Sequence, residues 1–320
     1  MAVYTSLSDV DLTTLLAGFD AGTLVAYAPI SAGIENSNYA VTTTQGGFVL
    51  TLFEHHAADE VREFVRLGRH LASRDLCVPA PVADRQGEWL HSLHHKPAIL
   101  CPRFAGHHPD SLTVAQCAAI GAELARFHQA SADLANPRQD ERGYDWWQGV
   151  APDLEQDLNT DDKRLLRDEL EFQRSQRALW CQLPHGWIHA DLFHDNALFD
   201  GDRLTAILDL YNACEGAWLY DLAIVANDWC ARGDGGLDDG RLQALTAAYD
   251  AGRAFTETEK SAWNTVLRGA ALRFWLSRLL AARMAAGRGE RLPAHKQPQE
   301  YRDRLLWHRQ SAAAILLNNS

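Results

Sequence analysis

Three side chains that can handle a proton or a metal ion lie close together in the sequence: Asp191, Asn196 and Asp209. Asp191 and Asn196 fall in the segment His-Ala-Asp-Leu-Phe-His-Asp-Asn, which starts at His189, and Asp209 ends the apolar run at 204–208. Transfer of a phosphoryl group from ATP needs a base that orients the acceptor and oxygen ligands for magnesium, because catalysis depends on positioning and charge neutralisation. These residue types could supply both.

A β-hairpin is expected between the two halves of this motif. Residues 197–199 and 204–208 have strand character, and the Asp-Gly step between them is typical of a tight hairpin turn. The hairpin would return Asp209 to the neighbourhood of Asn196. An amide and a carboxylate side by side suit magnesium better than zinc or copper, and Asp191 would remain available to the hydroxyl of a substrate.

This pattern resembles the catalytic loop of the aminoglycoside phosphotransferase and choline kinase superfamily, in which His-x-Asp-x-x-x-x-Asn precedes a strand that ends in a metal-binding Asp. The resemblance implies Asp191 as catalytic residue, Asn196 and Asp209 as magnesium ligands, and ATP as phosphoryl donor. It also implies that His189 braces the loop and that Asp221, in Trp-Leu-Tyr-Asp-Leu-Ala-Ile, is structural support. The alternative is a dinuclear metallohydrolase, because His-x-Asp-x-x-His can bind metals, but it explains fewer residues.

The composition is that of a large acidic chain. Its 320 residues are 47% hydrophobic, which is enough to build two lobes, and we place these at residues 1–104 and 105–320. The net charge of -12 disfavours nucleic acid or an anionic membrane as a partner, because both favour basic surfaces. We therefore expect a small-molecule substrate as the partner. The sequence does not indicate an oligomeric state.

The cysteines and the N-terminal residues indicate the cellular compartment in which the protein is expected. Six cysteines are spread along the chain without Cys-x-x-Cys spacing, so we expect reduced thiols. The first residues carry acids and no basic segment before an apolar run, which is unlike a secretory or transit signal. No window approaches the length of a membrane span. These features predict a cytoplasmic protein.

Hydrophobic periodicity predicts an α+β protein, with a small mixed lobe followed by a larger, mainly helical one. In the first lobe we expect a capped helix at 10–16, strands at 24–30, 39–43 and 48–53, a helix at 58–73, and strands near 89–93 and 98–101. In the second lobe we expect helices at 111–128, 161–181, 219–231, 238–251, 256–286 and 300–317. With the resemblance above, this order implies a two-lobed protein-kinase-like fold.

The first lobe carries a narrower resemblance. Gly-Ile-Glu-Asn-Ser-Asn-Tyr at 33–39, followed by Phe-Val-Leu-Thr-Leu-Phe-Glu at 48–54, resembles homoserine kinases of the phosphotransferase-like type. This implies ATP-dependent phosphorylation of the homoserine hydroxyl, a step of threonine biosynthesis. The nucleotide contacts implied are the loop residues Gly33, Asn36, Ser37 and Asn38 and the hinge residues Pro102 and Phe104. Kinases for choline, an aminoglycoside or a methylthio sugar are the alternative.

Thr51 departs from the broader kinase pattern, because the third strand would ordinarily supply a lysine for the phosphates of ATP. No lysine precedes Lys96, so the usual strand-to-helix ion pair cannot form. Backbone amides helped by Arg62, Arg66 or Arg69 could replace it, or these arginines could form a solvated helix face. A binding protein that has lost turnover is the alternative of another class, although the catalytic base and both metal ligands are present.

The residues that bind the acceptor have a weaker sequence signal than the catalytic motif. A homoserine kinase needs groups for the substrate ammonium and carboxylate, and we assign Asp228 to the ammonium and Arg273 to the carboxylate as substrate-binding residues beside Asp191. The structural alternative is that Asp228 pairs within its own lobe and that Arg273 forms an interhelical ion pair.

Overall fold

The structure is a computed structural model, and it describes residues 4–30, 36–293 and 296–311. The chain divides into two compact units. The first contains the residues up to His108 together with Ala197–Tyr211, and the second contains Pro109–Asn196 and the residues from Asn212 onward. The division that we expected after residue 104 remains a prediction. These units differ from it chiefly in grouping the hairpin strands with the N-terminal residues.

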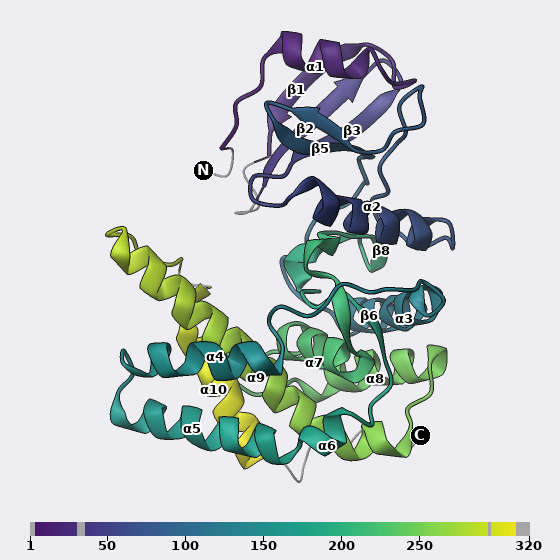
Figure 1. Cartoon of the computed structure of the whole chain (residues 1–320). Helices are drawn as coiled ribbons and strands as arrows, with labels where there is room; N and C mark the ends of the chain where they lie inside the picture. Colours follow the sequence, from purple (N-terminus) through teal and green to yellow (C-terminus); the bar gives the residue numbers. More distant parts are fainter. Residues whose placement is uncertain (1–3, 31–35, 294–295, 312–320) are drawn as a thin grey trace. The chain divides into compact units, whose positions relative to one another are not determined.

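A five-stranded antiparallel sheet forms the core of the first unit, with strand order β1-β2-β3-β5-β4 (Figure 1). The strands are β1 (Leu24–Pro29), β2 (Ser37–Thr43), β3 (Gly46–Leu52), β4 (His91–Leu93) and β5 (Lys96–Pro102), and the helices are α1 (Asp9–Leu16) and α2 (Ala58–Ala72). Buried residues of α1 share one core with Tyr39 and Leu50, whereas α2 packs through Phe64 near Phe53 and Ile99. The predicted elements of this lobe are confirmed.

The expected hairpin is also present. Strand β7 (Ala197–Asp200) pairs with β8 (Arg203–Ile207), with Ala197 opposite Ile207. Gly201 in the turn has a φ of 62°, which glycine adopts readily. A backbone hydrogen bond of 2.7 Å from Ile207 to Cys77 attaches the hairpin to its own unit.

The second unit is mainly helical (Figure 1). Its helices are α3 (Val114–Ser131), α4 (Tyr144–Glu155), α5 (Thr160–Ser175), α6 (Arg177–Trp180), α7 (Trp218–Trp229), α8 (Asp239–Gly252), α9 (Glu257–Gly287) and α10 (Pro298–Gln310). A two-stranded antiparallel sheet joins β6 (His185–Ile188) to β9 (Cys214–Ala217). The prediction lacked α4, β6 and β9, and the helix expected at 161–181 is divided at Gln176 between α5 and α6.

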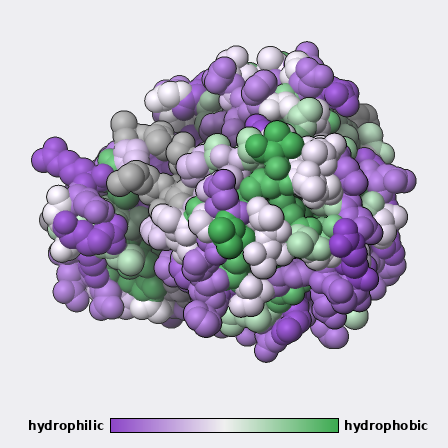
Figure 2. All heavy atoms as spheres, turned by 90° about the horizontal axis from the view of Figure 1, so that it is seen from above, coloured by the Kyte–Doolittle hydropathy of each residue, from purple (hydrophilic) through white to green (hydrophobic). Residues whose placement is uncertain are grey.

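The surface is largely hydrophilic on the face shown in Figure 2, where hydrophobic residues form limited areas. All six cysteines lie within the described residues and are free thiols. In the part of the chain that the structure describes, none of the helices has both the length and the apolar character that crossing a bilayer requires.

Candidate active site

A loop with an unusual backbone carries Asp191. The loop follows β6 directly, and Ala190 in it has a φ of 64°, in the left-handed region that a residue with a Cβ adopts only at a cost. The carboxylate of Asp221 holds this conformation, because it accepts backbone N–H groups from His189 (2.7 Å) and Ala190 (2.8 Å). Asp221 is fully buried in the first turns of α7. This geometry supports the role that we expected for it.

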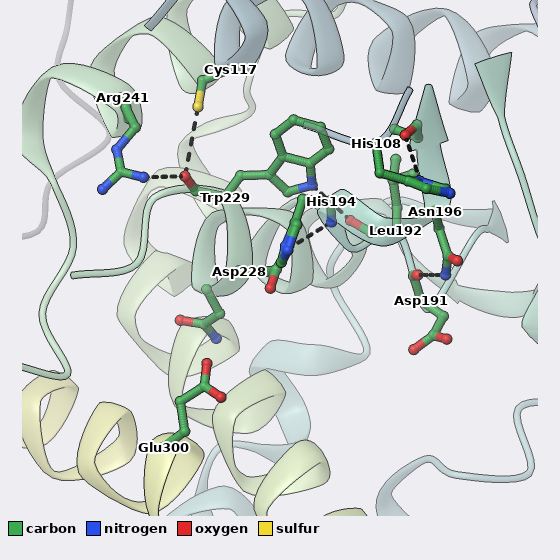
Figure 3. A network of polar contacts seen from close by, with 12 residues as sticks. His108, Cys117, Asp191, Leu192, His194, Asn196, Asp228, Trp229, Arg241 and Glu300 are labelled. Carbon is green, nitrogen blue, oxygen red and sulfur yellow. Dashed lines mark hydrogen bonds and ion pairs between the residues drawn. The ribbon is translucent and has the colours of Figure 1, made fainter. Parts of the chain in front are cut away.

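The carbonyl groups of the same loop are held from three directions. Arg273 on α9 donates to the carbonyl of Ala190 (3.0 Å), and Asn196 donates through Nδ2 to that of Asp191 (2.7 Å). The indole of Trp229 donates to the carbonyl of Leu192 (3.0 Å) (Figure 3). Because these hydrogen bonds fix several consecutive backbone groups, the loop is a rigid platform for the side chain of Asp191.

The carboxylate of Asp191 lies between two groups of the same unit. Its Oδ1 is 3.6 Å from Nη1 of Arg273, and its Oδ2 accepts a 3.4 Å hydrogen bond from Nδ2 of Asn212. A quarter of the side chain remains exposed, whereas only 3% of Arg273 does. Asp191 is therefore both oriented and accessible. His189 accepts the N–H of Asp191 through Nδ1 (3.3 Å), which favours the bracing role expected for this buried histidine.

A buried hydrogen-bonded chain lies behind Asp221. Tyr249 on α8 contacts Nδ1 of His128 (2.8 Å), and Nε2 of His128 contacts Asp221 (3.1 Å). Burial lowers the pKa of His128 more than Asp221 raises it, so the imidazole is neutral. Burial by itself would raise the pKa of Asp221, but the hydrogen bond from His128 and its other donors leave it lowered. Asp221 is therefore an anion that orders its neighbours.

Asp228, two helical turns after Asp221, holds the far end of the loop. Its Oδ2 accepts from the backbone N–H of His194 (2.7 Å) and contacts Nδ1 of the same residue (2.8 Å), as Figure 3 shows. The hydrogen bond to Asp228 raises the pKa of His194. The structural alternative that we gave for Asp228, pairing within its own lobe, describes this contact. The assignment of Asp228 to the substrate ammonium remains a prediction.

Asn196 and Asp209 have the donor types that magnesium prefers. Because Asn196 donates through Nδ2, its Oδ1 stays available, and no described residue donates a hydrogen bond to it. Asp209 is exposed and has a φ of 56°, a conformation uncommon for a residue other than glycine and often found at functional sites. An amide oxygen and a carboxylate fit a cation that keeps several waters in its shell.

In the first unit, Thr51 and Asn38 lie opposite each other on β3 and β2, and the hydroxyl of Thr51 donates to Oδ1 of Asn38 (2.7 Å). Ser37 points to the other face of the sheet, since side chains alternate along a strand. There it donates to Glu54 (2.5 Å), which also pairs with Lys96. Lys96, the first lysine of the chain, therefore forms its ion pair on the face of the sheet opposite Thr51.

The remaining nucleotide candidates are distributed as follows. Pro102 ends β5, Phe104 is half-buried in the segment after it, and the side-chain amide oxygen of Asn36 accepts from the backbone of Glu54 (3.4 Å). Gly33 lies outside the described residues. The α2 arginines have local partners: Arg62 pairs with Asp59, Arg66 with Glu63 (2.6 Å), and Arg69 stacks over Trp89.

Comparison with known proteins adds to this geometry. Residues 26–255 match the model of the phosphotransferase enzyme family, well over half of the chain. The chain belongs to this family. It is 44% identical to the homoserine kinase of Methylobacillus flagellatus, over 87% of each chain. It is 40% identical to the homoserine kinase of Neisseria meningitidis, over 88% of this chain and 91% of that one.

Solved structures show the same fold at low sequence identity. An amicoumacin kinase, solved in complex with AMP-PNP and Ca2+, matches with a TM-score of 0.69 at 14% identity, over 96% of this chain and 94% of that one. An aminoglycoside phosphotransferase from Alicyclobacillus acidocaldarius matches with a TM-score of 0.68 at 16% identity, over 98% of each. The two-lobed kinase-like fold expected for this family member is confirmed.

Sequence reasoning missed three contributors to the site. His128 is 93 residues before Asp221, and Asn212 is 21 residues after Asp191, so neither belongs to the catalytic motif. The left-handed conformation of Ala190 carries no glycine or asparagine signal. Only the Asp-Leu-Tyr-Asn order at 209–212, immediately after the metal-ligand candidate, could have drawn attention to Asn212.

Proposed function

We propose that this protein is a homoserine kinase, which transfers the γ-phosphoryl group of ATP to the hydroxyl of L-homoserine and gives O-phospho-L-homoserine for threonine biosynthesis. The observation that carries the proposal is the identity of 40 to 44% with homoserine kinases over most of both chains. The rigid loop that presents Asp191 supports it, since phosphoryl transfer depends on positioning.

In this proposal Asp191 accepts a hydrogen bond from the acceptor hydroxyl and takes its proton as the new P–O bond forms. Arg273 and Asn212 hold its two oxygens, so the carboxylate meets the hydroxyl in one orientation. Asn196 and Asp209 would hold magnesium. When bound, the ion supplies charge neutralisation at the phosphates of ATP.

The nucleotide contacts remain part of the proposal. We assign the loop residues around Asn36 and Asn38 to the phosphates and the backbone at Pro102 and Phe104 to adenine. The AMP-PNP bound to the amicoumacin kinase of the same fold supports ATP as the donor. The free thiols favour a reducing, cytoplasmic location. The net charge of -12 favours a small-molecule partner over nucleic acid or an anionic membrane.

An acceptor panel with magnesium and ATP tests the function. We expect phosphorylation of homoserine at a kcat/KM at least about 100-fold above that of serine, threonine, choline or an aminoglycoside, as discrimination by buried polar contacts permits. Preference for any other acceptor in the panel, or no turnover of any, would overturn the proposal.

Replacing the catalytic carboxylate tests the mechanism. Asp191→Asn keeps the shape of the side chain and removes the base, so kcat should fall by about 1,000-fold or more while ATP still binds with nearly normal affinity. The matched control is Asp195→Asn, which neutralises a carboxylate four residues away in the same motif. Equal losses in both variants would contradict a specific role for Asp191.

A further inference from the structure

A pair of oppositely charged side chains near Asp191 lacks the contacts that charged groups usually make. Arg142 is exposed and forms no ion pair with any described residue. Asp140 is half-buried, and among the described residues its carboxylate accepts only the backbone N–H of Arg142, at 2.8 Å through Oδ1. Burying a carboxylate costs free energy unless it is paired or hydrogen-bonded, so this partly buried and unpaired group is suited to bind a cation.

Hydrogen bonds place this segment beside the catalytic loop within the second unit. Nη1 of Arg142 donates to Oδ1 of Asn212 (3.3 Å), and Nδ2 of Asn212 donates to Asp191 (3.4 Å). The backbone carbonyl of Arg138 accepts from Glu215 on β9 (2.6 Å), which fixes the start of the segment. The guanidinium of Arg142 is therefore two hydrogen bonds away from the catalytic carboxylate.

The hydroxyl of Tyr220 is a third polar group that interacts with Asp140. The hydroxyl of Tyr220 on α7 is buried and has no hydrogen-bond partner among the described residues. Asp140 and Arg273 both act electrostatically on this hydroxyl. Burial raises the pKa of Asp140, and the hydrogen bond from the backbone N–H of Arg142 and the charges of Arg273 and Arg142 offset this only in part. A cation that entered beside Asp140 would relieve the cost of burying its charge.

We propose that Asp140 binds the ammonium group, and Arg142 the carboxylate, of the amino acid whose hydroxyl is presented to Asp191. This inference rests on the proposed function and assigns its acceptor site. Homoserine is short, so groups that bind its ammonium and carboxylate must lie near the residue that binds its hydroxyl. Asp140 and Arg142 meet that condition, and neither side chain forms an ion pair with a described residue. Arg273 is buried and engaged by Ala190 and Asp191, and Asp228 is engaged by His194.

Acceptors that lack one charge test each residue separately. The full-length enzyme is assayed with homoserine, with 4-hydroxybutyrate, which has no ammonium, and with 3-amino-1-propanol, which has no carboxylate. Asp140→Asn keeps the acceptor for the N–H of Arg142, so the segment should keep its shape. It should lower kcat/KM for homoserine by about 10 to 100-fold, leave 4-hydroxybutyrate unchanged, and leave the KM of ATP unchanged.

Arg142→Gln should show the complementary pattern. The kcat/KM for homoserine should fall by about 10 to 100-fold, and that for 3-amino-1-propanol should stay the same. The matched control is Glu141→Gln, which removes an exposed charge between the two residues and should leave all three acceptors unchanged. A purely structural role for Asp140 or Arg142 would instead lower turnover of all three acceptors together.

The outcomes separate this inference from the proposed function. If wild-type enzyme does not phosphorylate homoserine, the proposed function fails. If it does, but Asp140→Asn and Arg142→Gln still discriminate against the analogues as wild type does, the acceptor assignment fails alone. If Asp228→Asn loses the preference for homoserine over 4-hydroxybutyrate and Asp140→Asn keeps it, then Asp228 binds the ammonium group and Asp140 does not.

Discussion

At the scale of single residues, the site depends on one strained alanine. Ala190 adopts a left-handed conformation because Asp221 captures its N–H and Arg273 its carbonyl, and the conformation costs about 1 to 2 kcal/mol for a residue with a Cβ. This left-handed conformation turns the backbone between His189, which is buried, and Asp191, which stays partly exposed. Strain at a catalytic loop is common where the surrounding contacts enforce it.

Ala190→Gly should therefore be nearly neutral for stability. The relief of strain offsets the lost methyl group and the greater chain entropy of unfolded glycine, so we expect a change of less than about 1 kcal/mol. Ala223→Gly is the control, since Ala223 is fully buried inside α7 and should lose about 1.5 kcal/mol. Urea unfolding measures both. If Ala190→Gly lowers the free energy of unfolding as much as Ala223→Gly does, the backbone of Ala190 is not strained.

The sequence identifies the residues that could carry out the chemistry better than the residues that hold them in position. The types and spacing of Asp191 and Asn196 follow from what phosphoryl transfer requires, so they can be read locally. The partners Asn212 and His128 come from distant segments, and nothing in their own neighbourhood marks them. The same holds for Asp140, which stands out only because its carboxylate forms no ion pair with a described residue.

At the scale of elements, close helix packing shapes the second unit. A Cβ placed on Gly121 of α3 would lie 2.3 Å from the carbonyl oxygen of Leu245 in α8. This contact with backbone cannot be relieved by a rotamer change, so the two helices would have to separate. Since α3 carries His128 and α8 carries Tyr249, the packing also sets the chain of contacts that ends at Asp221.

Gly121→Ala should destabilise the protein by about 2 kcal/mol or more. The control is Gly149→Ala in α4, where glycine is exposed and a Cβ would meet no atom within 4 Å. That change should stabilise by up to about 1 kcal/mol, because alanine is the better helix former. Thermal unfolding compares the two, and a similar small effect in both would show that the approach of α3 to α8 is not tight.

Elements with strong periodicity were predictable, and those that depend on distant partners were not. The strands of the first unit and the helices α7, α8 and α9 follow the expected ranges closely. Strands β6 and β9 have four residues each, and glycine interrupts both, so their pairing is set by tertiary contacts. Helix α4 contains Gly149 and Pro152, which indicate a loop when read locally.

At the scale of the whole molecule, buried histidines make stability depend on pH. Burial lowers the pKa of His308 on α10 to about 3, and that of His128 is lowered for the same reason. In the unfolded chain both would titrate near the ordinary value of about 6.5. The unfolded state therefore binds more protons below that pH, and stability falls as the pH falls. His194 acts in the opposite direction, because its pKa is raised.

The contribution of His308 can be isolated by comparing pH slopes. Between pH 7.5 and 5.5 it should remove about 1.4 kcal/mol of unfolding free energy, because the unfolded imidazole gains a proton that the folded one refuses. His308→Gln should lose this part of the slope, while the control His55→Gln, an exposed residue, should keep it. Urea unfolding followed by tryptophan fluorescence suits the measurement, since every tryptophan except Trp89 lies in the same unit as His308. A slope in His308→Gln equal to that of wild type would mean that the folded protein protonates this histidine as readily as the unfolded chain does.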